Sequence, residues 1–151
     1  MSRPSTTKQK EVATKLGLDV SRASERVAAA RIRDELAEVI LERTHIPTPT
    51  KPQIEFAQSL GLDVAHDSFR VAFAKIQDCL EDENDRAIRE MDLRPGVEVE
   101  LAYEMDMGGK MKTFRDRFII SSIHRSGRVY FKNTTGHFAY ASQLSIPRRA
   151  A

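Results

Sequence analysis

The feature of this sequence that most constrains its fold is a repeated segment. The residues LGLDV occur at Leu16–Val20 and again at Leu60–Val64, 44 positions further on. When the chain is aligned with itself at this offset, 16 of the 29 residues from Lys8 to Leu36 are identical to their partners. Unrelated segments of average composition would share about two. The first two thirds of the chain therefore hold two copies of one unit.

Each copy has the start and stop signals of two helices joined by a short loop. Thr6 and Gln9 match the capping box, in which each side chain bonds to a backbone N–H at the start of a helix. Gly17 stands where a left-handed residue would end that helix, and Asp19 can bond locally in the loop. Ser24 then suits the N-cap of a longer second helix. The equivalent residues of the second copy are Thr50, Gln53, Gly61, Asp63 and Ser68.

The second helix of each copy has an apolar face at helical spacing. The face comprises Val27, Ala28, Ile32, Leu36 and Ile40 in the first copy, and Val71, Ala72, Phe73, Ile76 and Leu80 in the second. A unit of about 40 residues buries too little apolar surface to be stable alone, so we expect the copies to pack together. Solenoids usually need three or more repeats, and a different pattern follows the second copy.

After Met91 the pattern becomes that of short strands. Residues 97–105 alternate apolar and polar side chains, and residues 106–110 read as a loop. Residues 111–124 are long enough to bend from one sheet into another, and further short strands follow at 128–132, 137–141 and 145–147. Five short strands with tight turns in about 55 residues predict a small barrel. The predicted fold is α+β, with helical repeats at 1–47 and 48–93 and a β domain at 94–151.

Two resemblances follow from these motifs. The TKQ start at Thr7–Gln9, the glycine stop and the small residues of the second helix resemble SAP-like helix–extended loop–helix modules, over residues 6–42 and 50–80. They are also similar to helical repeats of phage and mobile-element proteins, although the second copy reads TKPQ. Such modules often bind DNA and also serve as protein-contact surfaces, so the resemblance implies one of these two roles.

The second resemblance covers residues 94–147. The segments PGVEVEL, FIISSI, GRVYFKN and ASQLSI resemble Src-homology-3-like barrels of the KOW and Tudor kind. The resemblance implies a five-stranded barrel with a helical turn before its last strand. Barrels of this kind bind RNA, DNA or peptides, so it leaves the function open.

The net charge of +2 conceals a segregation of charge along the chain. Residues 1–47 carry a net +2, residues 48–93 a net −5, and residues 94–151 a net +5. This asymmetry favours a polyanionic partner for the C-terminal segment and a basic partner for the middle one.

Cationic and aromatic residues are interspersed in the predicted barrel. We expect Val129 and Phe131 in the core, Tyr130 outside, and at least one of Phe138 and Tyr140 in the core. Basic side chains beside an exposed ring can bind phosphates while the ring stacks on a base. The candidates here are Lys110, Lys112, Arg115, Arg117, Arg125, Arg128, Tyr130 and Lys132.

The helical repeats add four basic candidates, Lys15, Arg22, Arg26 and Arg70. Arg26 and Arg70 occupy the first turn of the second helix in both copies, where a positive charge is mildly unfavourable to the helix dipole. Each arginine could reach a phosphate at the helix N-terminus. The alternative is an ion pair with Asp19 or Asp63 in the preceding loop.

No pattern in the sequence specifies a catalytic or metal site. The single cysteine, Cys79, rules out an internal disulfide and a cysteine-cluster zinc site, and the four histidines lack metal-ligand spacing. We therefore expect no enzyme activity, metal, cofactor or small-molecule substrate. No apolar run approaches the ~18–20 residues of a membrane span, so we expect a cytoplasmic protein that does not contact a membrane.

These observations favour a small non-enzymatic nucleic-acid-binding protein, with DNA favoured over RNA, that associates with a nucleoprotein machine. The alternative is a protein-interaction adaptor or inhibitor of phage or mobile-element type that docks on a larger nucleic-acid-processing complex. Phe56, Phe69 and Phe73 in the acidic second copy favour this alternative. A third interpretation is an enzyme subunit that another chain completes.

Overall fold

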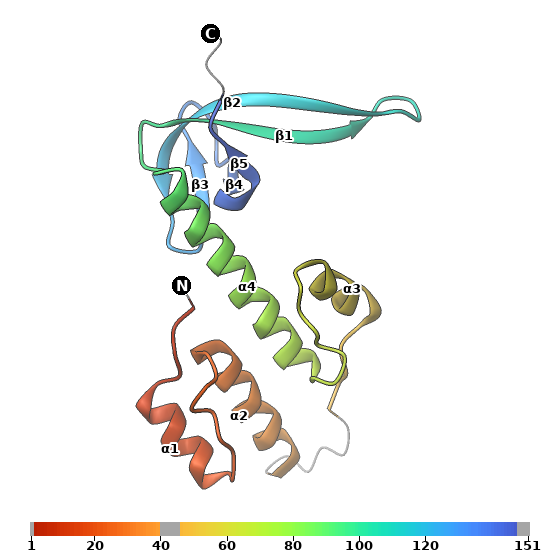
Figure 1. Ribbon diagram of the computed structural model, residues 1–151, viewed down its shortest axis with the longest axis vertical. Helices are drawn as coiled ribbons and strands as arrows, with labels where there is room; N and C mark the ends of the chain where they lie inside the picture. The colour runs from red at the N-terminus through yellow and green to blue at the C-terminus, as the bar shows by residue number, and fades with distance from the viewer. Residues whose placement is uncertain (1, 40–45, 148–151) are drawn as a thin grey trace. The chain divides into compact units, whose positions relative to one another are not determined.

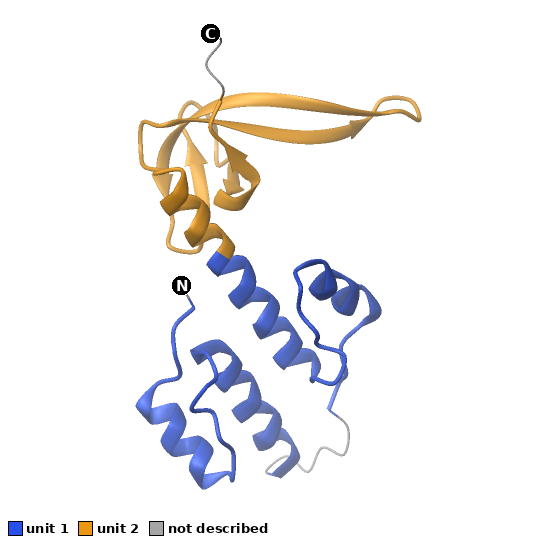
Figure 2. Cartoon of the chain, viewed as in Figure 1, with its two compact units in different colours: residues 1–82 blue, residues 83–151 orange. Residues whose placement is uncertain are grey.

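The computed structural model describes residues 2–39 and 46–147, which form an α+β fold of four helices and a five-stranded antiparallel sheet (Figure 1). The chain divides into two compact units, residues 1–82 and 83–151, and helix α4 continues from the first into the second (Figure 2). Ile40, expected on an apolar helix face, lies outside the described residues.

The first helix of each helical segment begins and ends as its sequence predicts. Helices α1 (Thr7–Lys15) and α3 (Lys51–Ser59) both begin with the complete capping box. Gly17 and Gly61 follow them with φ of +75° and +78°, in the left-handed region that favours glycine. The chain then turns back, with a hydrogen bond of 2.8 Å from the N–H of Leu18 to the carbonyl of Ala13 in the first segment.

The second helices, α2 (Glu25–Val39) and α4 (Phe69–Glu90), begin at the two predicted serine caps. The Oγ of Ser24 accepts the N–H of Val27 at 3.0 Å, and the Oγ of Ser68 accepts the N–H of Val71 at 3.1 Å. Each segment buries a small core between its own two helices, centred on Ala13, Val20 and Ala28 in the first and on Ala57, Val64, Ala72 and Ile76 in the second.

Helices α2 and α4 pack on each other through a reciprocal interface. The buried cluster between them consists of Val27, Ala30, Val71 and Ala74. The hydroxyl of Ser24 donates to the carboxylate of Asp78, and the hydroxyl of Ser68 donates to the carboxylate of Asp34. Each serine therefore caps its own helix while it bonds to an aspartate of the other segment. The two segments pack together, as their small size predicts.

The sheet has the strand order β4-β3-β2-β1-β5, with every neighbouring pair antiparallel. Its strands are β1 (Glu98–Asp106), β2 (Met111–Ile123), β3 (Arg128–Phe131), β4 (Phe138–Tyr140) and β5 (Leu144–Ser145), and a 3-10 turn at Ala141–Gln143 precedes β5. A bulge interrupts the pairing of β2 with β3 between Ile120 and Ser122. Because β4 and β5 lie at opposite edges, the sheet is open in its pairing, and the closed barrel stays a prediction.

The core of residues 83–151 lies between the sheet and the end of α4. Its buried residues are Leu93, Val99, Ile120, Val129, Phe131, Ala139, Ala141 and Leu144. The Oδ1 of buried Asn84 accepts the N–H of Ser142 at 3.0 Å. A Cβ at Gly127 would lie 2.6 Å from the Cβ of Asn84, so only glycine permits this approach of helix and turn.

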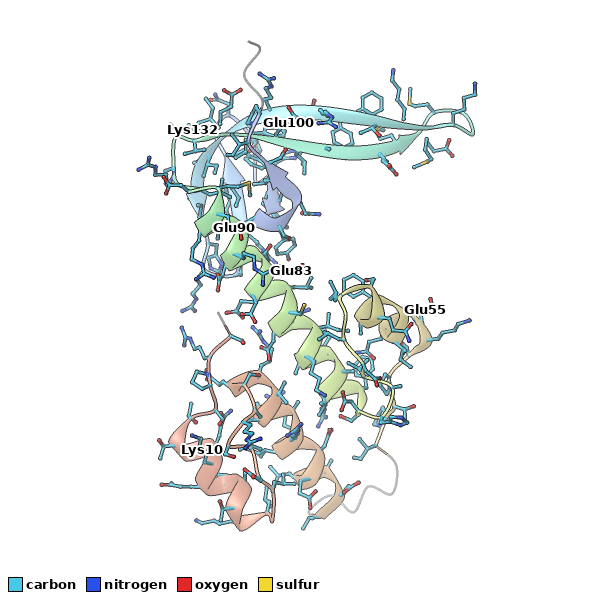
Figure 3. The ribbon with its side chains drawn as sticks, in the orientation of Figure 1. Lys10, Glu55, Glu83, Glu90, Glu100 and Lys132 are labelled. Atoms are coloured by element: carbon cyan, nitrogen blue, oxygen red, sulfur yellow. The ribbon has the colours of Figure 1, made fainter. Side chains whose placement is uncertain are left out.

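Beyond Leu101 the β1–β2 hairpin is a ribbon of two strands, which we call the arm (residues 102–118). Strand β5 pairs only with Glu100 and Leu101 of β1, and β3 pairs with β2 only from Ile120 onward. Figure 1 shows the hairpin running well past the other strands, and Figure 3 shows its side chains standing on both faces. The predicted apolar face continues along the arm, but Tyr103 and Met105 on it are exposed.

Candidate nucleic-acid interface

One face of the β3–β4 hairpin gathers three aromatic rings and an arginine. Arg128 pairs with Tyr140 and Tyr130 pairs with Phe138, so these four side chains project from the same face of the two strands. We call them the outer face. Val129, Phe131 and Ala139 alternate with them and are buried in the core on the opposite side.

The side chains of the outer face contact one another. The ring centroids of Tyr130 and Phe138 are 5.8 Å apart, and those of Phe138 and Tyr140 are 6.0 Å apart in an edge-on arrangement. The guanidinium carbon of Arg128 lies 4.8 Å from the centroid of Phe138, within cation–π distance. Hydrogen bonding to the Tyr140 phenol, and then to the Tyr130 phenol, raises the pKa of Arg128 above its ordinary value. The arginine is therefore held beside the rings with its charge intact.

The surroundings of the outer face are basic. No aspartate or glutamate occurs in the sequence after Asp116. Arg125 in the β2–β3 turn and Lys132 after β3 are exposed and make no ion pair within the described part of the chain (Lys132 is labelled in Figure 3). The outer face thus combines exposed π surfaces with cations that no described carboxylate neutralises.

The exposure of both Phe138 and Tyr140 corrects the expectation that at least one lies in the core. They are 42% and 39% exposed, while Ala139 and Ala141 occupy the buried positions between and after them. Ala87 and Ile88 of α4, and Met91 directly after it, pack against this core, so the inward positions take small residues and the rings face outward. The alternation of large and small residues in HFAYA was the signal for this arrangement.

The structure places the other four β-domain candidates on the arm, in a different electrostatic setting. Arg115 lies 3.0 Å from the carboxylate of Glu100, and Arg117 lies 3.7 Å from Glu100 and 3.9 Å from Glu98. The ammonium of Lys112 lies 5.3 Å from the centroid of Phe114, and Lys110 follows the glycine turn at the tip. The arm arginines are therefore partly neutralised by acids of the neighbouring strand.

The four basic candidates of the helical segments likewise differ in whether acidic side chains pair with them. Lys15 at the end of α1, Arg22 in the loop and Arg70 at the start of α4 are exposed. Arg26 instead bonds to Asp78 at 3.0 Å and to Glu81 at 2.8 Å, both on α4. Its ion pair thus joins the two helical segments, whereas the sequence suggested a partner in the preceding loop.

The loop aspartates bond locally instead. The carboxylate of Asp19 accepts the N–H of Ser21 at 2.9 Å, and that of Asp63 accepts the N–H of Ala65 at 3.2 Å. Hydrogen bonds from the side chain and backbone of Ser21, with a further contribution from the charge of Arg22, lower the pKa of Asp19. Both aspartates therefore act as turn residues, as expected of their positions.

The three phenylalanines proposed as protein contacts are on the surface. Phe56, Phe69 and Phe73 are 47%, 41% and 53% exposed, although Phe73 was also expected on the apolar face of its helix. Phe69 and Phe73 lie one turn apart on α4, and Gln53, three residues before Phe56, donates to the carbonyl of Phe69 at 3.3 Å. The equivalent residues of the first segment are Val12, Glu25 and Ala29.

Within residues 2–39 and 46–147, no group of three or more His, Cys, Asp or Glu side chains is arranged to hold a metal ion. None of the helices in this part of the chain has both the length and the apolar character needed to cross a membrane.

Comparison of the chain with protein-family models, with curated proteins and with solved structures gives no match in any of the three.

Proposed function

We propose that this chain is a small non-enzymatic protein that binds nucleic acid through the outer face of its β3–β4 hairpin. The observation that carries the proposal is the contact of Arg128 with exposed Phe138, beside exposed Tyr140 and half-buried Tyr130, in a segment without acidic residues. Exposed rings stack on bases of any identity, and the neighbouring cations bind phosphates. Arg125 and Lys132 would supply these contacts together with Arg128.

Stacking requires unpaired bases, so the preferred ligand in this proposal is a single strand or a single-stranded region within a larger nucleoprotein complex. The bases of a duplex are stacked on one another and present only their edges in the grooves. The preference for DNA over RNA remains part of the proposal. The exposed cations Lys15, Arg22 and Arg70, and the arm cations, would add contacts that depend on charge alone.

The test compares two exposed aromatic residues of the same domain. Phe138→Ala removes a ring of the outer face, and Tyr103→Ala removes an arm ring of similar exposure. Fluorescence anisotropy with short labelled single-stranded DNA, single-stranded RNA and duplex DNA measures the affinities. Phe138→Ala should weaken binding of single strands by about tenfold, because stacking contributes ~1–3 kcal/mol per base. Tyr103→Ala should leave it within about twofold.

Two results would overturn the proposal. One is the absence of measurable binding to any of the three nucleic acids at low salt. The other is an equal loss of affinity in Phe138→Ala and Tyr103→Ala, which would show that the outer face has no special part. Tighter binding of the duplex than of either single strand would refute the stacking mode.

We also propose two finer features of the fold. The first is that the helical segments are copies of one duplicated unit, supported by their matching caps, the paired glycine conformations and the reciprocal serine–aspartate bonds. The second is that the sheet curls as a Src-homology-3-like barrel. The bulge in β2 and the 3-10 turn before β5 support it, because bulges bend strands and sharpen their twist.

The exposure of Phe56, Phe69 and Phe73 favours a second candidate function, that of an adaptor docking on another protein. The first segment suggests a clean test, because it carries Glu25 and Ala29 where the second carries Phe69 and Phe73. A double variant, Phe69→Glu with Phe73→Ala, should fold normally yet lose a partner that is retained after nuclease treatment. Retention of the partner by the double variant, or its release by nuclease alone, would argue against the adaptor.

A further inference from the structure

The arm leaves both of its long edges without a neighbouring strand. Beyond Leu101 no described strand other than β2 pairs with β1, and before Ile120 no described strand other than β1 pairs with β2. A two-stranded ribbon alone is only marginally stable in water. Independent stability requires three or more strands with an apolar face. The arm has such a face, with Tyr103 stacked on Phe114 at 5.7 Å and exposed Met105 beside them. It therefore lacks a third strand.

The hydrogen-bond pattern fixes which backbone groups point away from the ribbon. The N–H of Met107 bonds to the carbonyl of Lys110 at 2.8 Å across the tip, and bonded and non-bonded pairs alternate from there. The groups of Thr113, Arg115 and Arg117, with those of Met111, therefore point outward from β2. The next outward residue, Ile119, already accepts the N–H of Lys132 at 2.8 Å. The free edge of β2 is thus residues 111–117, whose midpoint is Phe114.

This edge is complementary to itself. When two such edges run antiparallel about an axis at Phe114, Lys112 of each copy faces Asp116 of the other. Opposite charges placed directly across an antiparallel pair are stabilising. One oxygen of Asp116 accepts the Tyr103 hydroxyl at 2.9 Å, which leaves acceptor capacity for a lysine. The two Phe114 rings would lie beside the axis, each backed by its own Tyr103.

The other edge of the arm does not match itself. The residues of β1 that point outward beyond its pairing with β5 are Ala102, Glu104 and Asp106. An antiparallel pair centred on this edge would place Glu104 opposite Glu104, and like charges directly across a pair are destabilising. Charged side chains are a common protection of an exposed edge strand. Self-association is therefore directed to β2.

We propose that two copies of this chain associate through the β2 edges of their arms, forming a continuous four-stranded sheet with Lys112–Asp116 pairs on either side of a two-fold axis at Phe114. The arm carries four basic residues, Lys110, Lys112, Arg115 and Arg117, and three acidic ones, Glu104, Asp106 and Asp116. This near balance of charge suits a second copy better than a polyanion. The interface is separate from the outer face and does not depend on nucleic acid.

The first experiment exchanges the charges. Sedimentation equilibrium of nuclease-treated full-length protein over a range of concentrations gives the dimer dissociation constant. Lys112→Asp and Asp116→Lys should each weaken the dimer by about tenfold or more, because each places like charges across both pairs. The double variant carrying both changes restores opposite charges and should return to within a few-fold of the parent.

The second experiment uses two prolines placed opposite each other in the arm. Thr113 and Glu104 are direct partners in the β1–β2 register, and both N–H groups point outward on opposite edges. Proline is tolerated where the N–H makes no ladder bond, so each change should preserve the ribbon. Thr113→Pro should abolish the dimer, and Glu104→Pro should leave the dissociation constant within about threefold.

Hydrogen exchange of the parent protein supplies a measurement without substitutions. At concentrations that favour the dimer, the amides of Thr113 and Arg115 should exchange slowly while that of Glu104 exchanges fast. A protein that remains monomeric up to about 1 mM would overturn the proposal. So would greater damage from Glu104→Pro than from Thr113→Pro, or failure of the double charge variant to restore association.

Discussion

Gly127 shows how one residue can decide whether two elements meet. Its φ of +91° and the position of Asn84 both exclude a side chain there. Gly136 provides a comparison, because its φ is +69° but nothing lies within 4 Å of an added Cβ. The two glycines thus separate the effect of backbone conformation from that of crowding.

We therefore predict that Gly127→Ala is much more destabilising than Gly136→Ala. The first should lower the free energy of unfolding by about 3 kcal/mol, through a left-handed backbone and overpacking together. The second should lower it by about 1 kcal/mol, through the backbone alone. Urea unfolding followed by circular dichroism measures both. Equal losses would show that the contact with Asn84 does not constrain the fold.

The phenol of Tyr103 offers a prediction on pH. Its hydrogen bond to Asp116, with smaller effects of burial and of the carboxylate charge, raises the pKa of Tyr103 above its ordinary value. The folded state thus favours the protonated phenol. The stability that this bond contributes is present below pH ~10 and is lost as the pH rises through the folded pKa.

Ultraviolet titration of tyrosinate in dilute protein tests this prediction. Asp116→Asn should shift the Tyr103 ionisation down toward pH ~10 and leave the other tyrosines unchanged. Comparison with Tyr103→Phe identifies the ionisation that belongs to this residue. An unchanged titration curve in Asp116→Asn would contradict the assigned cause.

Residue-scale expectations from the sequence were most accurate where a local backbone rule applies. The capping threonines and serines and the helix-ending glycines all have the predicted roles, because those roles depend on neighbours within a few residues. The partners of Arg26 were not predicted, because Asp78 and Glu81 are more than 50 residues away in the chain. Aspartate stands at the matching positions 34 and 78 of the two helical segments, and this was the available signal.

Among the elements, the contact of α2 with α4 is the most specific. Asp78 accepts from Ser24 and also pairs with Arg26, whereas Asp34 accepts from Ser68, and Arg70 makes no equivalent ion pair among the described residues. The position that would match Glu81 is Ala37 in the first segment. The reciprocal interface is therefore stronger on one side.

This asymmetry predicts unequal effects of two matched substitutions. Asp78→Ala should lower the free energy of unfolding by about 2 kcal/mol and Asp34→Ala by about 1 kcal/mol, because the first also removes a charge-assisted bond. Glu55→Ala, at an exposed i,i+4 pair with Lys51, serves as the control and should change stability by less than about 0.5 kcal/mol. Thermal unfolding gives all three values. A larger loss in Asp34→Ala would contradict the asymmetry.

At the element scale, the turns and strands of the β domain followed from glycine, asparagine and alternation in the sequence. The arm did not, since alternating side chains predict a strand and its faces but not whether a third strand lies beside it. Tyr103 and Met105 continue the apolar pattern of Val99 and Leu101, yet only the latter two lie where β5 or the core covers them. Long-range pairing decides this difference.

For the whole molecule, the distribution of charge matters more than its total. The net charge is +2, but the segment after Asp116 is free of acids, and this segment contains the outer face. The clustering of cations was predicted from the sequence. Its partial neutralisation on the arm, by Glu98 and Glu100, depends on the strand register and was not predicted.

The affinity for nucleic acid should therefore depend on salt as expected for a small number of phosphate contacts. Three phosphate contacts by Arg125, Arg128 and Lys132 predict a slope of log affinity against log salt of about −2 for a single strand too short to reach the other cations. Arg128→Gln should reduce its magnitude by about 0.7, whereas Arg115→Gln should change it less. Anisotropy titrations at several salt concentrations measure the slopes. A larger change from Arg115→Gln would place the contacts on the arm.

If the proposed duplication is correct, the reciprocal serine–aspartate hydrogen bonds between α2 and α4 bear on how the chain arose. A single ancestral unit would have carried both the serine donor and the aspartate acceptor. Two such molecules could therefore have formed a symmetric dimer through the same bonds. Joining their coding sequences would have made that encounter intramolecular and much more favourable. The two segments now differ, the first having the more basic sequence and the second three exposed phenylalanines.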